Sequence, residues 1–333
     1  MMTTLKRTAL AAVLAIAGLA PAARAADVIK IDGSSTVYPI TEAVAEEFGS
    51  QSGGKTRITV GISGTGGGFK KFARGETDIQ DASRPILAQE MADAKANGID
   101  YIELPIAFDA LTVVVNKNNN WVDHLTIDEL KKMWEPAAQG KVMKWSDIRA
   151  GWPDAPLKLY GPGADSGTFD YFTEAAVGKS KSSRGDYTAS EDDNVLVQGV
   201  SSDKNALGYF GYAYYAENKD KLKAVPVVDP KPNKAVPPSD ETVMNATYNP
   251  LARPVFIYVS TKSLQKPEVR KFVEFYLANA ADLARDVKYI PLPEDAYEKA
   301  TARLKEGKSG SAYGGKAEAG VHIDELFQRE LKS

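Results

Sequence analysis

The stretch Ala110-Leu-Thr-Val-Val-Val115 is a nearly unbroken run of apolar and β-branched residues. A strand that is apolar on both faces is expected inside a sheet that is covered on both sides. Strands and helices alternate before it: Val28–Ile31 and Arg57–Ile62 have the pattern of strands, and Val37–Phe48 and Phe69–Phe72 that of helices. This alternation predicts an α/β fold built in layers.

The sequence becomes polar and turn-like from Asn116, and an apolar, strand-like run occurs again at Arg253–Val259. Leu125–Trp134 is predicted as a helix capped by Thr126, and Leu157–Tyr160 as a strand. The stretch from residue 225 to 240 holds five prolines and is predicted as an extended loop. Further helical segments are expected at Trp145–Ile148 (with Ser146 as a capping candidate), Glu268–Ala278 and Asp295–Leu304.

The first 25 residues have the order of a secretory signal peptide. Lys6 and Arg7 precede an apolar run from Thr8 to Leu19, and Ala23-Arg-Ala25 supplies the small residues of a cleavage site. The run is shorter than the roughly 18 to 20 residues that a membrane span needs. We therefore expect a mature chain beginning at Ala26; a buried N-terminal helix is the alternative.

The remaining 308 of the 333 residues suggest two domains. The two could follow one another, or one could interrupt the other, with the chain leaving at Ala110–Val115 and returning at Arg253–Val259. The texture of the sequence leaves both arrangements open.

The composition excludes several classes of protein. There is no cysteine, which rules out a lipid-modified cysteine at the cleavage site, a thiol nucleophile and cysteine metal ligands. Of the 41 basic residues three lie in the leader, so the mature chain has 38 basic against 44 acidic residues and a net charge of −6. That balance argues against a non-specific nucleic-acid binder, which should carry a basic face.

Three segments place Gly, Ser and Thr where a strand turns into a helix. They are Asp32–Thr36, Gly61–Gly68 and Gly161–Thr168, with a helix expected from Phe169. The first turn of a helix has free N–H groups and the positive end of the helix dipole, and hydroxyls add uncharged donors. Each loop alone is explained by helix capping. Together, the three indicate one shared site for a tetrahedral oxyanion.

Two charged residues belong to the same hypothesis. Arg84 precedes Pro85, which favours an extended backbone, and its guanidinium could bind two oxygens of one phosphate. Asp165 could accept the proton of monohydrogen phosphate, which sulfate lacks. The alternatives are a surface ion pair for Arg84 and a helix cap for Asp165. A nucleotide loop is excluded because Phe69 replaces a required glycine and because Lys70 and Lys71 lack Walker A spacing.

The segments DGSSTVYPI, GISGTGGGFKKFARGETDIQDASRP and YGPGADSGTFDYF resemble, in order, the ligand segments of the periplasmic phosphate-binding proteins of Pst-type phosphate ABC transporters. The segments KWSDIRAGWPD, NALGYFGYAYY and RPVFIYVS resemble that family's framework, and the match runs from about Val28 to about Leu292. The resemblance implies a two-lobe periplasmic-binding-protein fold of type II, with lobe I at 26–112 and 251–333, lobe II at 113–250 and a hinge near Asp109 and Arg253. It also implies a monomer that binds inorganic phosphate, needs no cofactor and passes the ion to a membrane-embedded permease. The implied ligand shell is Ser35, Thr36, Ser63, Thr65, Ser83, Arg84, Asp165, Ser166, Gly167 and Thr168.

The chain departs from the family pattern at two places. Some members have an aspartate where Arg84 stands, and an arginine just before the third loop, where this chain has Pro162. Our hypothesis is that the arginine and the aspartate have exchanged segments, so that Arg84 and Asp165 keep both roles. One extra residue in the second loop leaves both Ser63 and Thr65 as candidates.

Three other functions are alternatives to phosphate binding. The ligand could be another oxyanion such as sulfate, molybdate or phosphonate. A secreted phosphatase would need a partnered base, but the two histidines, His124 and His322, lie far from the loops in sequence, and no metal-binding motif occurs. An adhesion or structural surface protein would show repeats or a low-complexity stalk, and neither is present.

Overall fold

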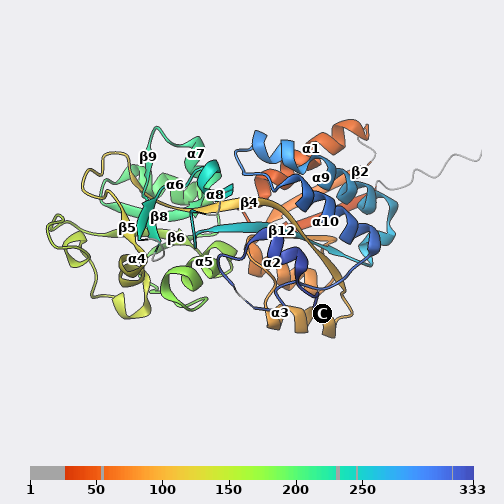
Figure 1. The fold of residues 1–333 in the computed structure, drawn as a ribbon, viewed down its shortest axis with the longest axis horizontal. Helices are drawn as coiled ribbons and strands as arrows, with labels where there is room; N and C mark the ends of the chain where they lie inside the picture. The colour runs from red at the N-terminus through yellow and green to blue at the C-terminus, as the bar shows by residue number, and fades with distance from the viewer. Residues whose placement is uncertain (1–26, 54–55, 230–232, 245–246, 317) are drawn as a thin grey trace, which may run out of the picture.

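The computed structural model describes residues 27–53, 56–229, 233–244, 247–316 and 318–333. The predicted signal peptide lies outside the described residues. Two long antiparallel strands, β4 (Tyr101–Asn116) and β12 (Ala252–Ser260), run through the middle of the molecule (Figure 1). They belong to one nine-stranded sheet of order β2-β1-β3-β12-β4-β8-β6-β7, in which β9 also pairs with β4.

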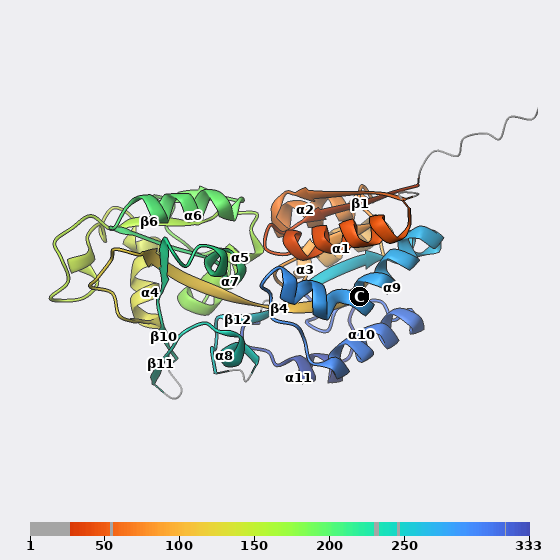
Figure 2. The same cartoon turned by 90° about the horizontal axis from the view of Figure 1, so that it is seen from above.

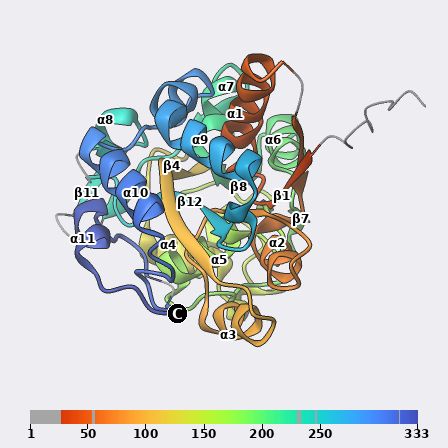
Figure 3. The same cartoon turned by 90° about the vertical axis from the view of Figure 1, so that its right-hand side faces the viewer.

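The lobe on the red and blue side of Figure 1, called lobe I here, contains both ends of the described chain. Its parallel strands extend the sheet from β12, and its core is one cluster of buried apolar side chains. Figure 3 shows α1 and α9 together on one side of the sheet and α2 and α3 together on the other. The elements of lobe I are β1 (Asp27–Gly33), α1 (Tyr38–Gln51), β2 (Thr56–Ile62), α2 (Gly64–Ala73), β3 (Ile79–Ala82), α3 (Ala88–Ala96), α9 (Pro267–Asp286), α10 (Glu294–Glu306) and α11 (Ile323–Gln328).

The green side of Figure 1, called lobe II, has its own apolar core around Trp134, Trp145 and Tyr209. Its strands β6 and β8 continue the sheet on the other side of β4, and a small three-stranded sheet packs nearby. The elements of lobe II are β5 (Leu125–Thr126), α4 (Ile127–Trp134), β6 (Lys158–Pro162), α5 (Gly167–Phe172), β7 (Thr188–Ser190), α6 (Asp193–Ser202), β8 (Ala206–Gly211), α7 (Tyr212–Glu217), β9 (Leu222–Ala224), β10 (Val227–Asp229), β11 (Lys234–Val236) and α8 (Asp240–Met244).

The path of the chain follows from the burial of β4. Fifteen of its sixteen residues are buried, with Phe108 the half-exposed one. Its first part pairs with β12 in lobe I and its second part with β8 in lobe II. Figure 2 shows β4 running from one lobe into the other. The chain leaves lobe I on β4 and returns on β12. The predicted α/β two-lobe fold is confirmed, while the lobe boundaries given above stay a prediction.

Several predicted element boundaries were wrong. α2 begins at Gly64 rather than Phe69, so the glycine-rich segment is itself helical. α5 begins at Gly167 rather than Phe169. The proline-rich stretch contains two paired strands, β10 and β11. Ser146 lies inside a 3₁₀ turn whose N-cap is Lys144.

Close packing explains why the helix α2 starts with glycines. A Cβ atom on Gly68 would lie 2.1 Å from Oε1 of Gln80 and 2.7 Å from Cα of Gly33. The helix therefore rests directly on β1 and β3, at a distance that only glycine permits. This contact fixes the start of α2 beside the ends of those strands. None of the helices in the described part of the chain is long and apolar enough to cross a bilayer.

Candidate functional site

The three glycine- and hydroxyl-rich segments meet where the lobes touch. The hydroxyl of Thr36, in lobe I, lies 3.1 Å from the hydroxyl of Thr168, in lobe II. The backbone N–H of Gly66 donates to the carbonyl of Asp165 at 2.8 Å. Loops separated by more than 90 residues along the chain thus form one contact.

The first segment is fixed by two tyrosines. Tyr214, from α7 of lobe II, donates its hydroxyl to the carbonyl of Ser35 at 3.1 Å, and Tyr289 of lobe I donates to the carbonyl of Thr36. The side chains of Ser35 and Thr36 are both buried. These bonds hold the backbone just before α1 in one position against both lobes.

Thr65 and Ser83 form a buried hydroxyl pair opposite Gly167. Their side-chain oxygens lie 3.1 Å apart, and the N–H of Ser83 donates to Oγ1 of Thr65. A Cβ atom on Gly167 would lie 2.5 Å from Oγ1 of Thr65 and 2.6 Å from Oγ of Ser83. The backbone of lobe II therefore approaches both hydroxyls of lobe I as closely as glycine allows.

Ser63, the other candidate of the second loop, lies apart from this group. Its hydroxyl donates to Asp32, whose carboxylate also pairs with Lys71 at 2.6 Å. The structure thus separates the two residues that the sequence left equal. Thr65 lies at the junction of the lobes, and Ser63 belongs to a polar cluster beside it.

The third segment begins α5, and Ser166 is its N-cap. The Ser166 hydroxyl accepts the N–H of Thr168 at 3.1 Å and that of Phe169 at 3.5 Å. Asp165 is a partly exposed residue whose carboxylate pairs with Lys70 at 2.8 Å. It does not cap the helix.

Arg84 does not pair with Asp165. Its Nε donates to Asp170, in α5, at 2.6 Å, and its two terminal nitrogens each donate to Glu90 at 2.8 Å. All of this guanidinium is buried. Burial alone would lower the pKa of Arg84, but the two carboxylates raise it above its ordinary value. Arg84 therefore links lobe I to lobe II through carboxylates.

A second buried arginine, Arg253 of β12, reaches the junction directly. It donates to the hydroxyl of Thr168 at 2.7 Å and to the carbonyl of Gly167 at 3.1 Å. Its Nε, and the same Nη2 that reaches Thr168, donate to Asp109 of β4. Sequence reasoning placed Arg253 and Asp109 at the hinge and missed this contact. The available signal was a pair of charged residues in two otherwise apolar strands, since such residues are rarely buried without a partner.

Two acidic residues near the lobe junction have raised pKa values. Burial raises the pKa of Asp193, at the start of α6, to about 8, and the neighbouring Asp109 adds to the effect. Burial also raises the pKa of Glu191, which accepts the N–H of Asp165. Burial thus favours the protonated, uncharged form of these two carboxyl groups beside the junction.

The arrangement gathers neutral donors around a small volume. Hydroxyls of Thr36, Thr65, Ser83 and Thr168 come from both lobes, with the starts of α1, α2 and α5 beside them. Hydroxyl and amide donors suit the oxygens of a small tetrahedral anion.

A comparison with known proteins gives the family. A model of the PBP superfamily domain matches residues 20–280. Protein SphX of Synechococcus elongatus is 53% identical over 302 residues, which are 91% of this chain and 88% of SphX. The phosphate-binding protein PstS of Staphylococcus haemolyticus is 40% identical over 279 residues, 83% of this chain and 84% of that protein.

The chain belongs to the phosphate-binding proteins of the PBP superfamily. A solved structure agrees with this. It is described as a phosphate ABC transporter substrate-binding protein of Clostridium perfringens with bound phosphate. It is 26% identical, covers 80% of this chain and 100% of its own, and superposes with a TM-score of 0.65.

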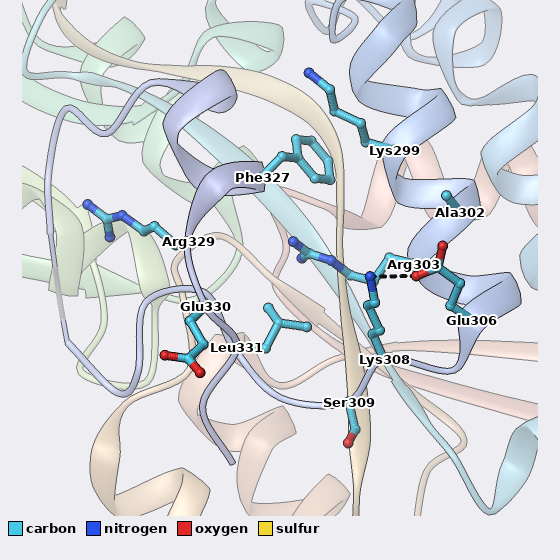
Figure 4. A pocket seen from close by; sticks show the side chains of 10 residues that line it. All are labelled: Lys299, Ala302, Arg303, Glu306, Lys308, Ser309, Phe327, Arg329, Glu330 and Leu331. Carbon is cyan, nitrogen blue, oxygen red and sulfur yellow. Dashed lines mark ion pairs between the residues drawn. The ribbon is translucent and has the colours of Figure 1, made fainter.

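A surface pocket on lobe I is a weaker candidate for the ligand site. It measures about 480 Å³ and lies between α10 and the end of the chain (Figure 4). Most of its cations already have partners: Lys308 pairs with Glu306, Lys299 with Asp295 and Arg329 with Glu318. Within the described ranges, no group of three or more His, Asp or Glu side chains could hold a metal ion.

Proposed function

We propose that this protein captures inorganic phosphate between its two lobes and delivers it to a membrane-embedded ABC transporter. The observation that carries the proposal is the meeting of the three glycine- and hydroxyl-rich segments at the lobe junction. Membership of the phosphate-binding family supports it, as does the phosphate bound to the Clostridium perfringens relative.

The ligand shell that we propose is narrower than the one implied by the sequence. It contains the groups that converge at the junction: Ser35, Thr36, Thr65, Ser83, Gly167 and Thr168. Ser166 supports it as the cap of α5. Ser63, Arg84 and Asp165 stay predictions. Ser63 and Asp165 contact Asp32 and Lys70 beside the junction, and the buried Arg84 contacts Glu90 and Asp170, so these contacts favour supporting roles.

The proposal includes the setting. The protein would work in the periplasm as a monomer after removal of the signal peptide, with lobes divided near residues 112 and 250. It would act by capture rather than catalysis, because neither histidine lies among the converging groups. His124 pairs with Asp123 in lobe II, and His322 precedes α11 in lobe I.

Calorimetric titration of the chain from Ala26 onward tests the function. We expect one phosphate per protein, and sulfate at equal concentration should not displace it. Displacement by sulfate would favour the general oxyanion binder and would remove the proton-acceptor role of Asp165. Release of phosphate from a chromogenic ester above background would instead favour the phosphatase.

A further inference from the structure

Arg253 is a buried cation that contacts the proposed ligand site through the hydroxyl of Thr168. Only 1% of its side chain is exposed, and its guanidinium contacts the carbonyl of Gly167 and the hydroxyl of Thr168 in lobe II. The guanidinium also lies over the ring of Tyr171, with its carbon 5.3 Å from the ring centroid. Both residues that it holds in lobe II belong to the proposed ligand shell.

The bond from Arg253 determines how Thr168 can act. A hydroxyl has one hydrogen to donate and two lone pairs to accept with. Since Arg253 has no lone pair to offer, the oxygen of Thr168 must be the acceptor in the 2.7 Å contact. The hydrogen of Thr168 is therefore left to donate elsewhere, to Thr36 at 3.1 Å or to a bound anion.

Asp109 fixes the guanidinium in this orientation. Arg253 and Asp109 lie opposite one another in the register of β12 and β4. Oδ2 of Asp109 accepts from two guanidinium nitrogens, at 2.9 and 3.2 Å. The pair is nearly neutral overall, so its effect on an anion comes from the direction of its bonds rather than from net charge.

The same reasoning separates Arg253 from Arg84. The guanidinium of Arg84 is already paired with two carboxylates, those of Glu90 and Asp170, and Lys181 lies 3.8 Å from Asp170. Its bonds end on those carboxylates and on the carbonyl of Pro85, and none reaches a hydroxyl of the proposed shell. Arg84 therefore cannot orient a hydroxyl of the shell in the way that Arg253 orients Thr168.

We propose that Arg253, on the strand joining the lobes, is the positioning arginine of the phosphate site and acts by making Thr168 a hydrogen-bond donor to the ion. The inference rests on the proposed function. It assigns to one ion pair two tasks: linking β12 to β4, and presenting the start of α5 to the ligand.

Substitution of Arg253 by lysine tests the inference. Lysine keeps a charge for Asp109 but lacks the planar fork that reaches both Thr168 and Gly167. We expect Arg253→Lys to remain folded and to bind phosphate about ten-fold more weakly, the effect of losing roughly one charge-assisted hydrogen bond. Arg303→Lys is the matched control, because Arg303 is also buried and donates to a carbonyl, that of Glu103, in lobe I. It should bind as the wild type does.

The double variant distinguishes positioning from mere packing. If Arg253 acts through Thr168, Arg253→Lys should add little to the loss caused by Thr168→Val, so the two losses should not multiply. Wild-type affinity in Arg253→Lys, or losses that multiply fully, would overturn the inference while leaving phosphate binding intact. Absence of phosphate binding in the wild type would instead overturn the proposed function. If Arg253→Lys failed to fold, wild-type affinity in a folded Asp109→Asn variant would overturn the inference, and a loss of about ten-fold would support it.

Discussion

Asp81 is a carboxyl group enclosed in the core of lobe I, two residues before Ser83 and three before Arg84. It is fully buried on β3, and neither of its oxygens has a donor at hydrogen-bonding geometry in the described chain. Burial raises its pKa to about 8. The nearby Thr41 hydroxyl lowers the pKa of Asp81, but its effect is smaller than that of burial. Because an aspartate in an unfolded chain has a pKa of about 3.9, Asp81 links folding to pH.

The sign of that linkage can be tested with Asp81→Asn. Between about pH 4 and pH 8 the unfolded chain has lost this proton while the folded chain keeps it, so stability falls as the pH rises. In the asparagine variant, the free energy of unfolding should therefore fall less steeply with pH, by at most the slope that one titrating proton contributes. Urea unfolding at pH 5 and pH 8 measures it, with the exposed Asp100→Asn as control. Equal pH dependence in Asp81→Asn and the wild type would contradict the prediction.

At the scale of single residues, the sequence predicted the kind of ligand site better than the contacts that individual side chains make. Gly, Ser and Thr at strand-to-helix turns indicated a shared oxyanion site, and those segments do meet. The partners of Arg84 and Asp165 could not be predicted, because Asp170 and Lys70 are 86 and 95 positions away from them and approach only through the fold. Arg253 was missed as a site residue for the same reason.

Among the elements, α2 depends on its distance from the sheet beneath it. An added Cβ at Gly68 would meet Gln80 and the backbone of Gly33, so Gly68→Ala should destabilise the protein by about 1 to 3 kcal/mol. Gly49→Ala is the control in α1, where nothing lies within 4 Å of the added carbon. It should stabilise the protein by up to about 1 kcal/mol through helix propensity. Chemical unfolding that shows the same sign for both variants would contradict this packing argument.

The helix α5 is tied to lobe I by the ion pair between Asp170 and Arg84. Both side chains are buried, so opening the lobes would separate charges that now satisfy each other. We expect Asp170→Asn to favour the open form, with a larger radius of gyration in small-angle scattering without phosphate and about ten-fold weaker phosphate binding. Asp128→Asn, at an exposed position of α4, should change neither quantity. An unchanged radius in Asp170→Asn would show that the pair does not hold the lobes together.

Elements with a strong apolar pattern were located correctly, although only six of the sixteen residues of β4 were predicted as strand. Elements that depend on close packing were missed. β4, β12 and α1 follow from runs of buried apolar residues. The helical start of α2 did not, since glycine disfavours a helix unless packing demands it. The pairing of β10 with β11 was hidden by prolines in the same stretch.

For the whole molecule, the texture of the sequence left two arrangements open, and the structure has the interrupted one. The reason is that the apolar run at Ala110–Val115 is only six of the sixteen residues of β4. The part of β4 that precedes it, from Tyr101, pairs with β12 inside lobe I. Both lobes thereby share two strands. A ligand that touches both lobes at their junction would then favour the closed form.

The central claim is that phosphate binds where Gly167 meets Thr65 and Ser83. Equilibrium dialysis with radioactive phosphate tests it on the wild type, Gly167→Ala and Gly185→Ala. The added carbon at Gly167 would lie 2.5 Å from the Thr65 hydroxyl, whereas at Gly185 its nearest neighbour, Oε1 of Gln139, is 3.6 Å away. We predict one phosphate per chain for the wild type and Gly185→Ala, and at least ten-fold weaker binding for Gly167→Ala. Wild-type binding by Gly167→Ala, or no binding by the wild type, would contradict the account.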